Sequence, residues 1–216
     1  MIKDNLHEIN RKLPSDVTLV AVSKFHPVER LMEAYNAGQR VFAESRPQEL
    51  AAKVPQMPAD VQWHFIGHLQ TNKLKLVLPY VSLVQSVDSL HLLQAISTWA
   101  VANNKVVDVL LELHLGAEET KQGFSEDEIL SICHSERSEE SIRIRGLMGM
   151  ASNTEDMEQV EGEFARIEAL YKRIKASGME GFDTLSIGMS GDWPLAVQHG
   201  ATMVRIGTDI FGPREY

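Results

Sequence analysis

Eight short apolar runs, separated for most of the chain by segments with helical spacing, limit the folds open to this sequence. Their apolar content is nearly continuous rather than alternating, which is typical of strands covered on both faces, as in parallel sheets. Eight such units predict an α/β fold of the (β/α)8 TIM-barrel type, and a doubly wound open sheet is the alternative. We expect strands at 18–24, 40–45, 63–68, 82–87, 106–115, 144–151, 183–190 and 202–211.

The two ends of the chain favour the closed barrel. Residues 1–12 carry Ile2, Leu6 and Ile9 at helical spacing, and Pro14 ends that pattern. The chain stops five residues after the last predicted strand, which leaves no eighth helix. The extra N-terminal helix could fill that place in the outer ring. We therefore expect one domain, residues 1–216, near the lower size limit of such a barrel.

Composition excludes several classes of partner. The formal net charge of −9 repels nucleic acid and anionic membranes over most of the surface. No run of about 18 apolar residues could span a membrane, and the N-terminus lacks the apolar segment of a signal peptide. The single cysteine, Cys133, fits a reducing compartment. We expect a cytoplasmic protein without nucleic-acid or membrane partners.

Two loops of the predicted barrel suit a phosphate group. In such barrels phosphate commonly binds to the loops after strands 7 and 8. After strand 7, Ser190 offers a hydroxyl and Gly191 lets a ligand approach the backbone, directly before a helix. After strand 8, Gly207 and Thr208 form another small turn rich in hydrogen-bond donors. The alternative is that these glycines only shape tight turns.

Lys24 and Arg205 extend the phosphate hypothesis to a particular cofactor. Lys24 ends the first predicted strand, where partial desolvation favours an uncharged amine that attacks an aldehyde. A lysine facing a phosphate site is the minimum needed to bind pyridoxal 5′-phosphate (PLP) as an imine. Arg205 lies on the same strand face as Gly207 and could meet the pyridine nitrogen, which would leave the cofactor a weaker electron sink. The alternatives are a solvated lysine and an ion-paired arginine inside the barrel.

Two other polar features do not point to chemistry. His64 and His68 are four residues apart, but in a predicted strand and without a Glu-x-x-His pattern, so we expect no metal site. Residues 134–141, HSERSEES, form a polar low-complexity segment, which we interpret as a surface extension.

Six segments make the chain resemble a known family. They are AVSK (21–24), WHFIGHLQTNK (63–73), QSVDSL (85–90), EETKQGF (118–124), RGLMGM (145–150) and LSIGMSGDWPLAVQHGATMVRIGTDIFGPREY (185–216). Together they resemble the YggS/PROSC family of PLP homeostasis proteins, whose barrel is similar to the N-terminal domain of alanine racemase. The resemblance covers essentially the whole chain and implies a fold type III PLP barrel.

The resemblance also implies roles for matching residues. Lys24 would be the aldimine lysine, Arg205 would meet the pyridine nitrogen, and the phosphate would be held by Ser190, Gly191, Gly207 and Thr208.

Three segments near the expected site carry residues that bear on this assignment. The family's Gly-Glu-Asn motif reads Ala43-Glu44-Ser45 here, so the Ser45 hydroxyl would replace an asparagine beside the cofactor. The family's Asn-Ile-Ser after strand 5 reads His114-Leu115-Gly116, which weakens polar contacts expected there. Lys121 keeps a family lysine and could be a second amine near the mouth of the site.

Three functions agree with these residues. The first is a non-catalytic PLP-binding protein, expected as a monomer, that holds the cofactor and delivers it to apo forms of PLP-dependent enzymes. It is favoured because alanine racemase takes its second base, a tyrosine, from an additional domain that we do not expect here. The alternative is a slow PLP-dependent racemase or lyase completed by a partner. A phosphosugar aldolase with a Schiff-base lysine is the third.

Overall fold

The computed structural model describes residues 1–116, 122–135 and 140–213. Its eight parallel strands close into a barrel in chain order, which confirms the predicted (β/α)8 fold and rules out the open sheet. Lys121, residues 136–139 of the polar segment, and Tyr216 lie outside the described residues. The strands are β1 (Thr18–Val22), β2 (Val41–Glu44), β3 (Gln62–Phe65), β4 (Val81–Val87), β5 (Val107–Leu113), β6 (Ile142–Gly149), β7 (Thr184–Ser186) and β8 (Met203–Ile206).

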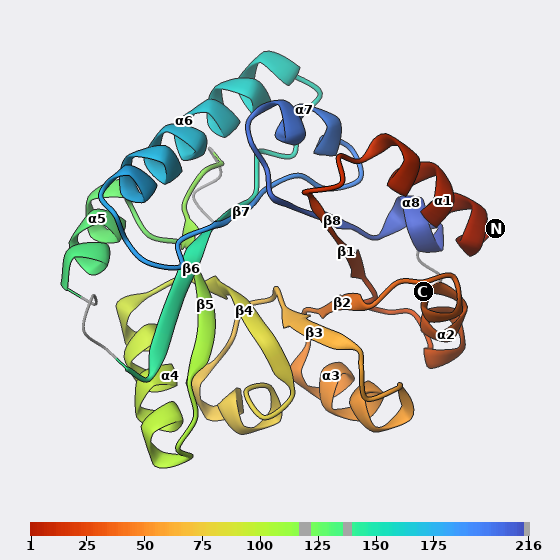
Figure 1. Cartoon of the computed structure of the whole chain (residues 1–216), viewed down its shortest axis with the longest axis horizontal. Helices are drawn as coiled ribbons and strands as arrows, with labels where there is room; N and C mark the ends of the chain where they lie inside the picture. Colours follow the sequence, from red (N-terminus) through yellow and green to blue (C-terminus); the bar gives the residue numbers. More distant parts are fainter. Residues whose placement is uncertain (117–121, 136–139, 214–216) are drawn as a thin grey trace.

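Helices surround the barrel, as Figure 1 shows. The connection between β3 and β4 carries a 3₁₀-helix, η2 (Thr71–Leu76), rather than an α-helix. A second 3₁₀-helix, η1 (Val54–Gln56), extends α3. The α-helices are α1 (Ile2–Lys12), α2 (Val28–Asn36), α3 (Pro47–Lys53), α4 (Leu90–Ala102), α5 (Glu126–Ser135), α6 (Met157–Ala176), α7 (Trp193–Gln198) and α8 (Thr208–Phe211). No helix in the described residues is long and apolar enough to cross a membrane.

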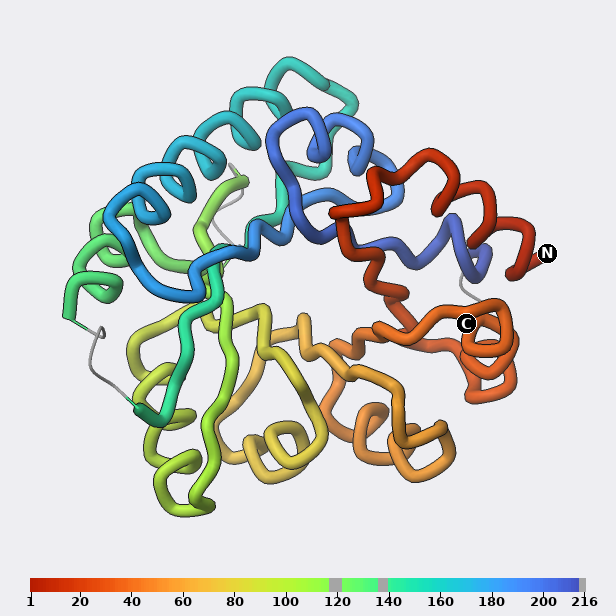
Figure 2. Tube along the Cα trace, viewed as in Figure 1, coloured from red at the N-terminus to blue at the C-terminus, as the bar shows by residue number. Residues whose placement is uncertain are grey.

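The pairing of the first and last strands brings the two ends of the sequence together. In β1 and β8, Val20 lies opposite Arg205 and Ala21 lies opposite Ile206. Figure 2 shows the trace running once around the ring until the last strand meets the first. Because parallel strands end at the same edge, the turn that follows β1 lies beside the turn that follows β8.

The prediction that the chain lacks an eighth helix was wrong. The last strand is shorter than expected, and residues 208–211 form the single turn of α8. β-Branched and aromatic residues made this segment look like a strand, but Ile210 and Phe211 are buried and Asn5 Nδ2 donates to the Ile210 carbonyl at 3.0 Å. Contact with α1 therefore outweighs the local preference of these residues for a β-strand. Figure 1 shows α1 beside α8, so the N-terminal helix completes the outer ring together with it.

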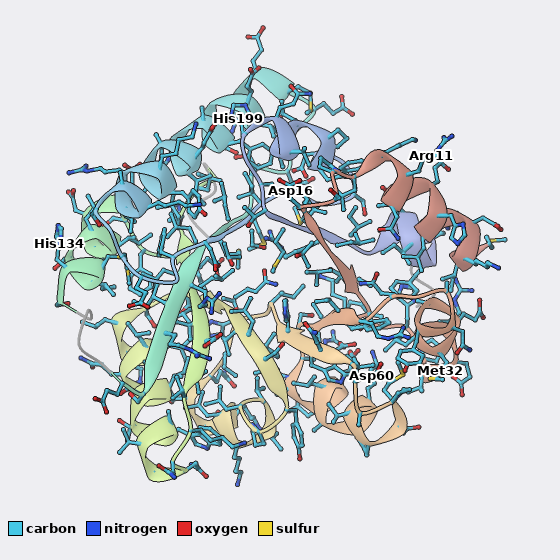
Figure 3. The ribbon with its side chains drawn as sticks, viewed as in Figure 1. Arg11, Asp16, Met32, Asp60, His134 and His199 are labelled. Atoms are coloured by element: carbon cyan, nitrogen blue, oxygen red, sulfur yellow. The ribbon has the colours of Figure 1, made fainter. Side chains whose placement is uncertain are left out.

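Inward-facing side chains fill the barrel. One apolar cluster comes from six different strands, and a larger one lies between the strands and the helices. Figure 3 shows side chains extending into the ring, whereas the labelled Arg11, Met32, Asp60 and His134 lie around its outside. The inner cluster consists of Val20, Ala43, Leu83, Leu110, Met148 and Met203.

Candidate functional site

A cavity of about 410 Å³ opens where the strands end at their carboxyl side. It brings together six of the seven residues that the sequence predicted for the site: Lys24, Ser190, Gly191, Arg205, Gly207 and Thr208. The rest of its lining consists of Val22, His26, Ile66, Met150, Asn153 and Met189.

Ser45 is not among the residues that line this cavity. It is half-buried in the turn after β2, and its backbone faces the turn after β3. A Cβ atom added to Gly67 would lie 2.1 Å from the Ser45 carbonyl oxygen, which shows how closely the two turns pack. A cofactor contact from the Ser45 hydroxyl therefore stays a prediction.

The turn that carries Lys24 is joined to the last helix. Lys24 is half-buried, two residues after the end of β1. Two residues further on, the His26 ring stacks on Phe211 with centroids 4.8 Å apart. Because Phe211 ends α8 and Thr208 begins it, this contact helps to fix the lysine turn relative to the rim formed by Gly207 and Thr208.

The two glycines of the rim have different roles. A Cβ on Gly207 would lie 3.1 Å from the Val22 carbonyl oxygen, so a larger residue would press β1 and β8 apart. A Cβ on Gly191 would have no heavy atom within 4 Å, so its backbone faces open space. Asp192 Oδ1 accepts from the Met189 N–H at 2.5 Å and closes the turn that presents Ser190 and Gly191. This turn can offer donors to an anion without rearrangement.

A chain of buried hydrogen bonds orients Arg205 from below the cavity. Arg205 Nη1 donates to Ser186 Oγ at 2.7 Å and to the Ser186 carbonyl at 2.8 Å, and Nη2 donates to the Gly149 carbonyl at 2.9 Å. The Ser186 hydroxyl donates to Gln85 Oε1 at 2.7 Å, and Gln85 Nε2 donates to His64 Nδ1 at 2.9 Å. This series of hydrogen bonds crosses the barrel from β8 to β3 and fixes the plane of the guanidinium.

Burial shifts the pKa values of His64 and Arg205, the two ends of this series of hydrogen bonds. It lowers the pKa of His64 to about 4, so the ring is neutral at pH 7 and Nδ1 accepts. It also lowers the pKa of Arg205 to about 10, while the negative charges of Glu112 and Asp192 oppose that change. Arg205 therefore stays protonated at neutral pH and remains a hydrogen-bond donor.

Glu112 is a buried carboxyl group near this arginine. On β5 its side chain points to the same side as Leu110, which belongs to the inner cluster. Burial and the negative charge of Asp88 raise its pKa to about 7, and the charges of Arg205 and His68 act in the opposite direction.

The sequence did not reveal the whole lining. His26 and Asn153 both line the cavity, and each follows the carboxyl end of a strand. The strand-end rule that selected Lys24 could also have selected them. Within the described ranges, no group of three or more His, Cys, Asp or Glu side chains is arranged to hold a metal ion.

Among the described residues, a lysine, a buried arginine and two turns rich in hydrogen-bond donors share one cavity, which defines a small ligand-binding barrel. Comparison with known proteins shows the family to which this barrel belongs. Residues 1–215 match the family described as "Alanine racemase, N-terminal domain", so the chain belongs to that family. The pyridoxal phosphate homeostasis protein of Vibrio alginolyticus is 37% identical over 210 residues, 95% of this chain and 90% of that protein. The protein of the same name from Schizosaccharomyces pombe is 38% identical over 204 residues, 92% of this chain and 85% of that one.

Solved structures give the same result. PipY of Synechococcus elongatus with PLP bound is 33% identical, with a TM-score of 0.90 over 98% of this chain and 100% of that chain. Alanine racemase from Bartonella henselae, at 15% identity and a TM-score of 0.73 over 60% of its own chain, shares the barrel fold. The predicted family and the fold type III barrel are both confirmed.

Proposed function

We propose that residues 1–216 form a single domain that binds PLP covalently through Lys24. Arg205 would donate to the pyridine nitrogen, and the phosphate would bind between Ser190, Gly191, Gly207 and Thr208. The observation that carries this proposal is the shared cavity, which holds the lysine, the arginine and both rim turns.

The residues present fit such a ligand. When bound, PLP supplies an aldehyde that combines reversibly with primary amines. The lining also includes the apolar side chains of Val22, Ile66 and Met150, which suit contact with a planar ring. Arg205 is held by three hydrogen bonds to the protein and carries a positive charge toward the same space.

We propose homeostasis rather than catalysis as the role of this binding. The curated relatives are named for pyridoxal phosphate homeostasis, not for an enzyme activity. An arginine that stays protonated disfavours the charged pyridinium on which strong electron withdrawal depends. No tyrosine is among the cavity-lining residues of the described chain. The protein would hold reactive PLP and pass it to apo forms of cytoplasmic PLP-dependent enzymes.

The protein would act as a monomer. In the described part of the chain, the exposed large apolar side chains are few, and the two that share a helix, Leu90 and Val101, lie at opposite ends of α4. We expect light scattering to give the mass of one 24.2 kDa chain with and without PLP. A stable dimer would contradict this part of the proposal.

Borohydride reduction followed by peptide mass mapping tests the covalent site. We expect a phosphopyridoxyl group on Lys24 and a yellow protein before reduction. An adduct on another lysine would overturn the site assignment, and a colourless protein would revive the aldolase alternative. Incubation of PLP-loaded protein with L-alanine in deuterated water tests the role, since Cα–H exchange at enzymatic rates would favour the racemase alternative.

The buried chain behind Arg205 yields a separate prediction. Ser186→Ala removes the group that joins Arg205 to Gln85, so the guanidinium loses one of its fixed partners. We expect PLP affinity to fall about tenfold, the effect of losing one hydrogen bond to a charged group. Absorbance titration measures this affinity.

Ser82→Ala is the matched control, because Ser82 is also a strand serine whose hydroxyl donates one hydrogen bond, to the Trp63 carbonyl at 3.2 Å. Ser82 has no hydrogen bond to Arg205, Ser186, Gln85 or His64, and it does not line the cavity. Equal losses in the two variants would show that the Ser186 effect is not specific to Arg205.

A further inference from the structure

Directly behind the lysine turn lies a buried cluster of charged side chains that does not line the cavity. Lys53 Nζ donates to Glu44 Oε1 at 2.6 Å and to Glu49 Oε2 at 3.1 Å. The side chains of Lys53 and Glu44 are 9% and 0% exposed, whereas Glu49 is 23% exposed. Figure 1 shows α3, which carries Lys53 and Glu49, outside β2 and β3.

This cluster holds both chain neighbours of Lys24. On one side, Lys53 Nζ donates to the Ser23 carbonyl at 2.9 Å, and the Ser23 hydroxyl donates to Glu44 Oε1 at 2.7 Å. On the other side, the Phe25 N–H donates to Glu49 Oε2 at 3.0 Å. Lys24 is therefore bracketed by two residues whose positions depend on the same three charges.

The backbone at this turn needs such support. Phe25 has φ of +68°, a conformation that bulky residues rarely adopt and that costs energy unless the surroundings enforce it. The hydrogen bond to Glu49 acts on the strained residue itself. The Arg46 guanidinium also lies 4.3 Å from the centre of the Phe25 ring.

Stability alone is a poor explanation for this arrangement. Bringing one lysine and two carboxylates out of water carries a large desolvation cost, and buried ion pairs are often no better than apolar replacements. Glu44 Oε2 is buried without a hydrogen-bond partner, which adds to that cost. Burial also raises the pKa of Glu44. This cluster carries a large desolvation cost and is hydrogen-bonded to both chain neighbours of Lys24. An effect on the position of Lys24 explains it better than a contribution to stability.

We infer that Lys53, Glu44 and Glu49 are positioning residues that fix the Lys24 turn, so that the amine is directed into the cavity for attack on an aldehyde. This inference rests on the proposed function, because it gives these three residues a purpose in PLP binding. It also makes a claim about the protein without the cofactor, namely that the turn is already ordered before PLP binds.

The experiment compares variants in cofactor-free and PLP-loaded protein. Lys53→Met removes the cation at similar volume, Glu49→Ala removes the acceptor of the Phe25 N–H, and Glu49→Gln restores an acceptor without the charge. Arg145→Met is the control, because Arg145 also pairs with two carboxylates, Asp183 at 2.7 Å and Asp108 at 3.6 Å, where the strands begin rather than where they end. Glu49 is partly exposed, so its variants keep the test possible if Lys53→Met fails to fold.

Three measurements report on positioning rather than on folding alone. They are hydrogen exchange of segment 23–26 without PLP, the rate at which an acylating reagent modifies Lys24 without PLP, and PLP affinity by absorbance. For Lys53→Met and Glu49→Ala we expect faster exchange at Phe25, an altered rate of Lys24 acylation and PLP affinity lower by about tenfold, as for loss of a charged hydrogen bond. Glu49→Gln should recover most of this loss, and Arg145→Met should change none of the three.

Folded Lys53→Met or Glu49→Ala protein with exchange at Phe25 and PLP affinity within twofold of the parent would overturn the inference. A parent protein that fails to bind PLP would overturn the proposed function instead. The exchange and acylation measurements would still decide whether the cluster orders the Lys24 turn.

Discussion

Replacement of Lys24 by alanine is expected to abolish covalent attachment of PLP and to weaken its binding by about 100-fold, or about 2.7 kcal/mol. Among the described residues, Lys24 is the lysine that lines the cavity, which it shares with Ser190, Gly191, Gly207 and Thr208 of the rim. Without it, the phosphate contacts and Arg205 can still bind the cofactor, but only reversibly and without a bond to the aldehyde. Residual weak binding is therefore expected rather than none.

Absorbance and borohydride trapping measure this loss, with Lys73→Ala as the control. Lys73 is half-buried in η2, which follows β3 at the same end of the barrel, but it does not line the cavity. We expect the Lys73 variant to keep the colour and the adduct of the parent. If Lys24→Ala keeps them as well, the covalent site lies elsewhere and the proposed function must be rebuilt around another amine.

Much of the fold was predictable because a parallel barrel repeats one local pattern eight times. Apolar runs buried on both faces and helices between them are encoded within short segments, so their order and class can be read along the chain. The error at residues 208–211 has a different origin. Whether Ile210 and Phe211 extend β8 or form α8 depends on α1, which lies about two hundred residues away in sequence and whose Asn5 binds the Ile210 carbonyl.

The site was predictable to the extent that it follows the rule of strand ends. That rule places Lys24, Arg205 and the two rim turns together, and the cavity contains all of them. It does not identify the groups that orient them. The bond between Ser186 and Gln85 joins residues 101 positions apart, and it exists only because the barrel closes with this register. The hydrogen bonds from α3 to the turn around Lys24 likewise cannot be predicted from the spacing of residues in the sequence.

Glu112 gives the second large effect, through the dependence of stability on pH. Burial and Asp88 raise the pKa of its carboxyl group from 4.5 to about 7, against the opposing charges of Arg205 and His68. His68 itself is bound to Asp88, with 2.8 Å between Nδ1 and Oδ2. Below pH 4.5 the folded and unfolded states are both protonated at this position. Between pH 4.5 and 7 the folded state keeps a proton that the unfolded state has lost, so folding stability falls as pH rises through this window.

Glu112→Gln removes this titration while keeping the shape of the side chain. We expect the variant to gain about 3 kcal/mol of unfolding free energy relative to the parent between pH 4 and pH 8, which corresponds to a pKa difference of about 2.5. Urea unfolding of cofactor-free protein at several pH values measures the gain, and Glu161→Gln on the exposed side of α6 controls for a change of one net charge.

The positive charge of Arg205 attracts the ionised carboxylate of Glu112 and so lowers its pKa, against the effect of burial. If the stability of the parent relative to Glu112→Gln rises instead of falling as pH rises, the attraction to Arg205 outweighs desolvation, and the pKa of Glu112 in the folded protein lies below its ordinary value.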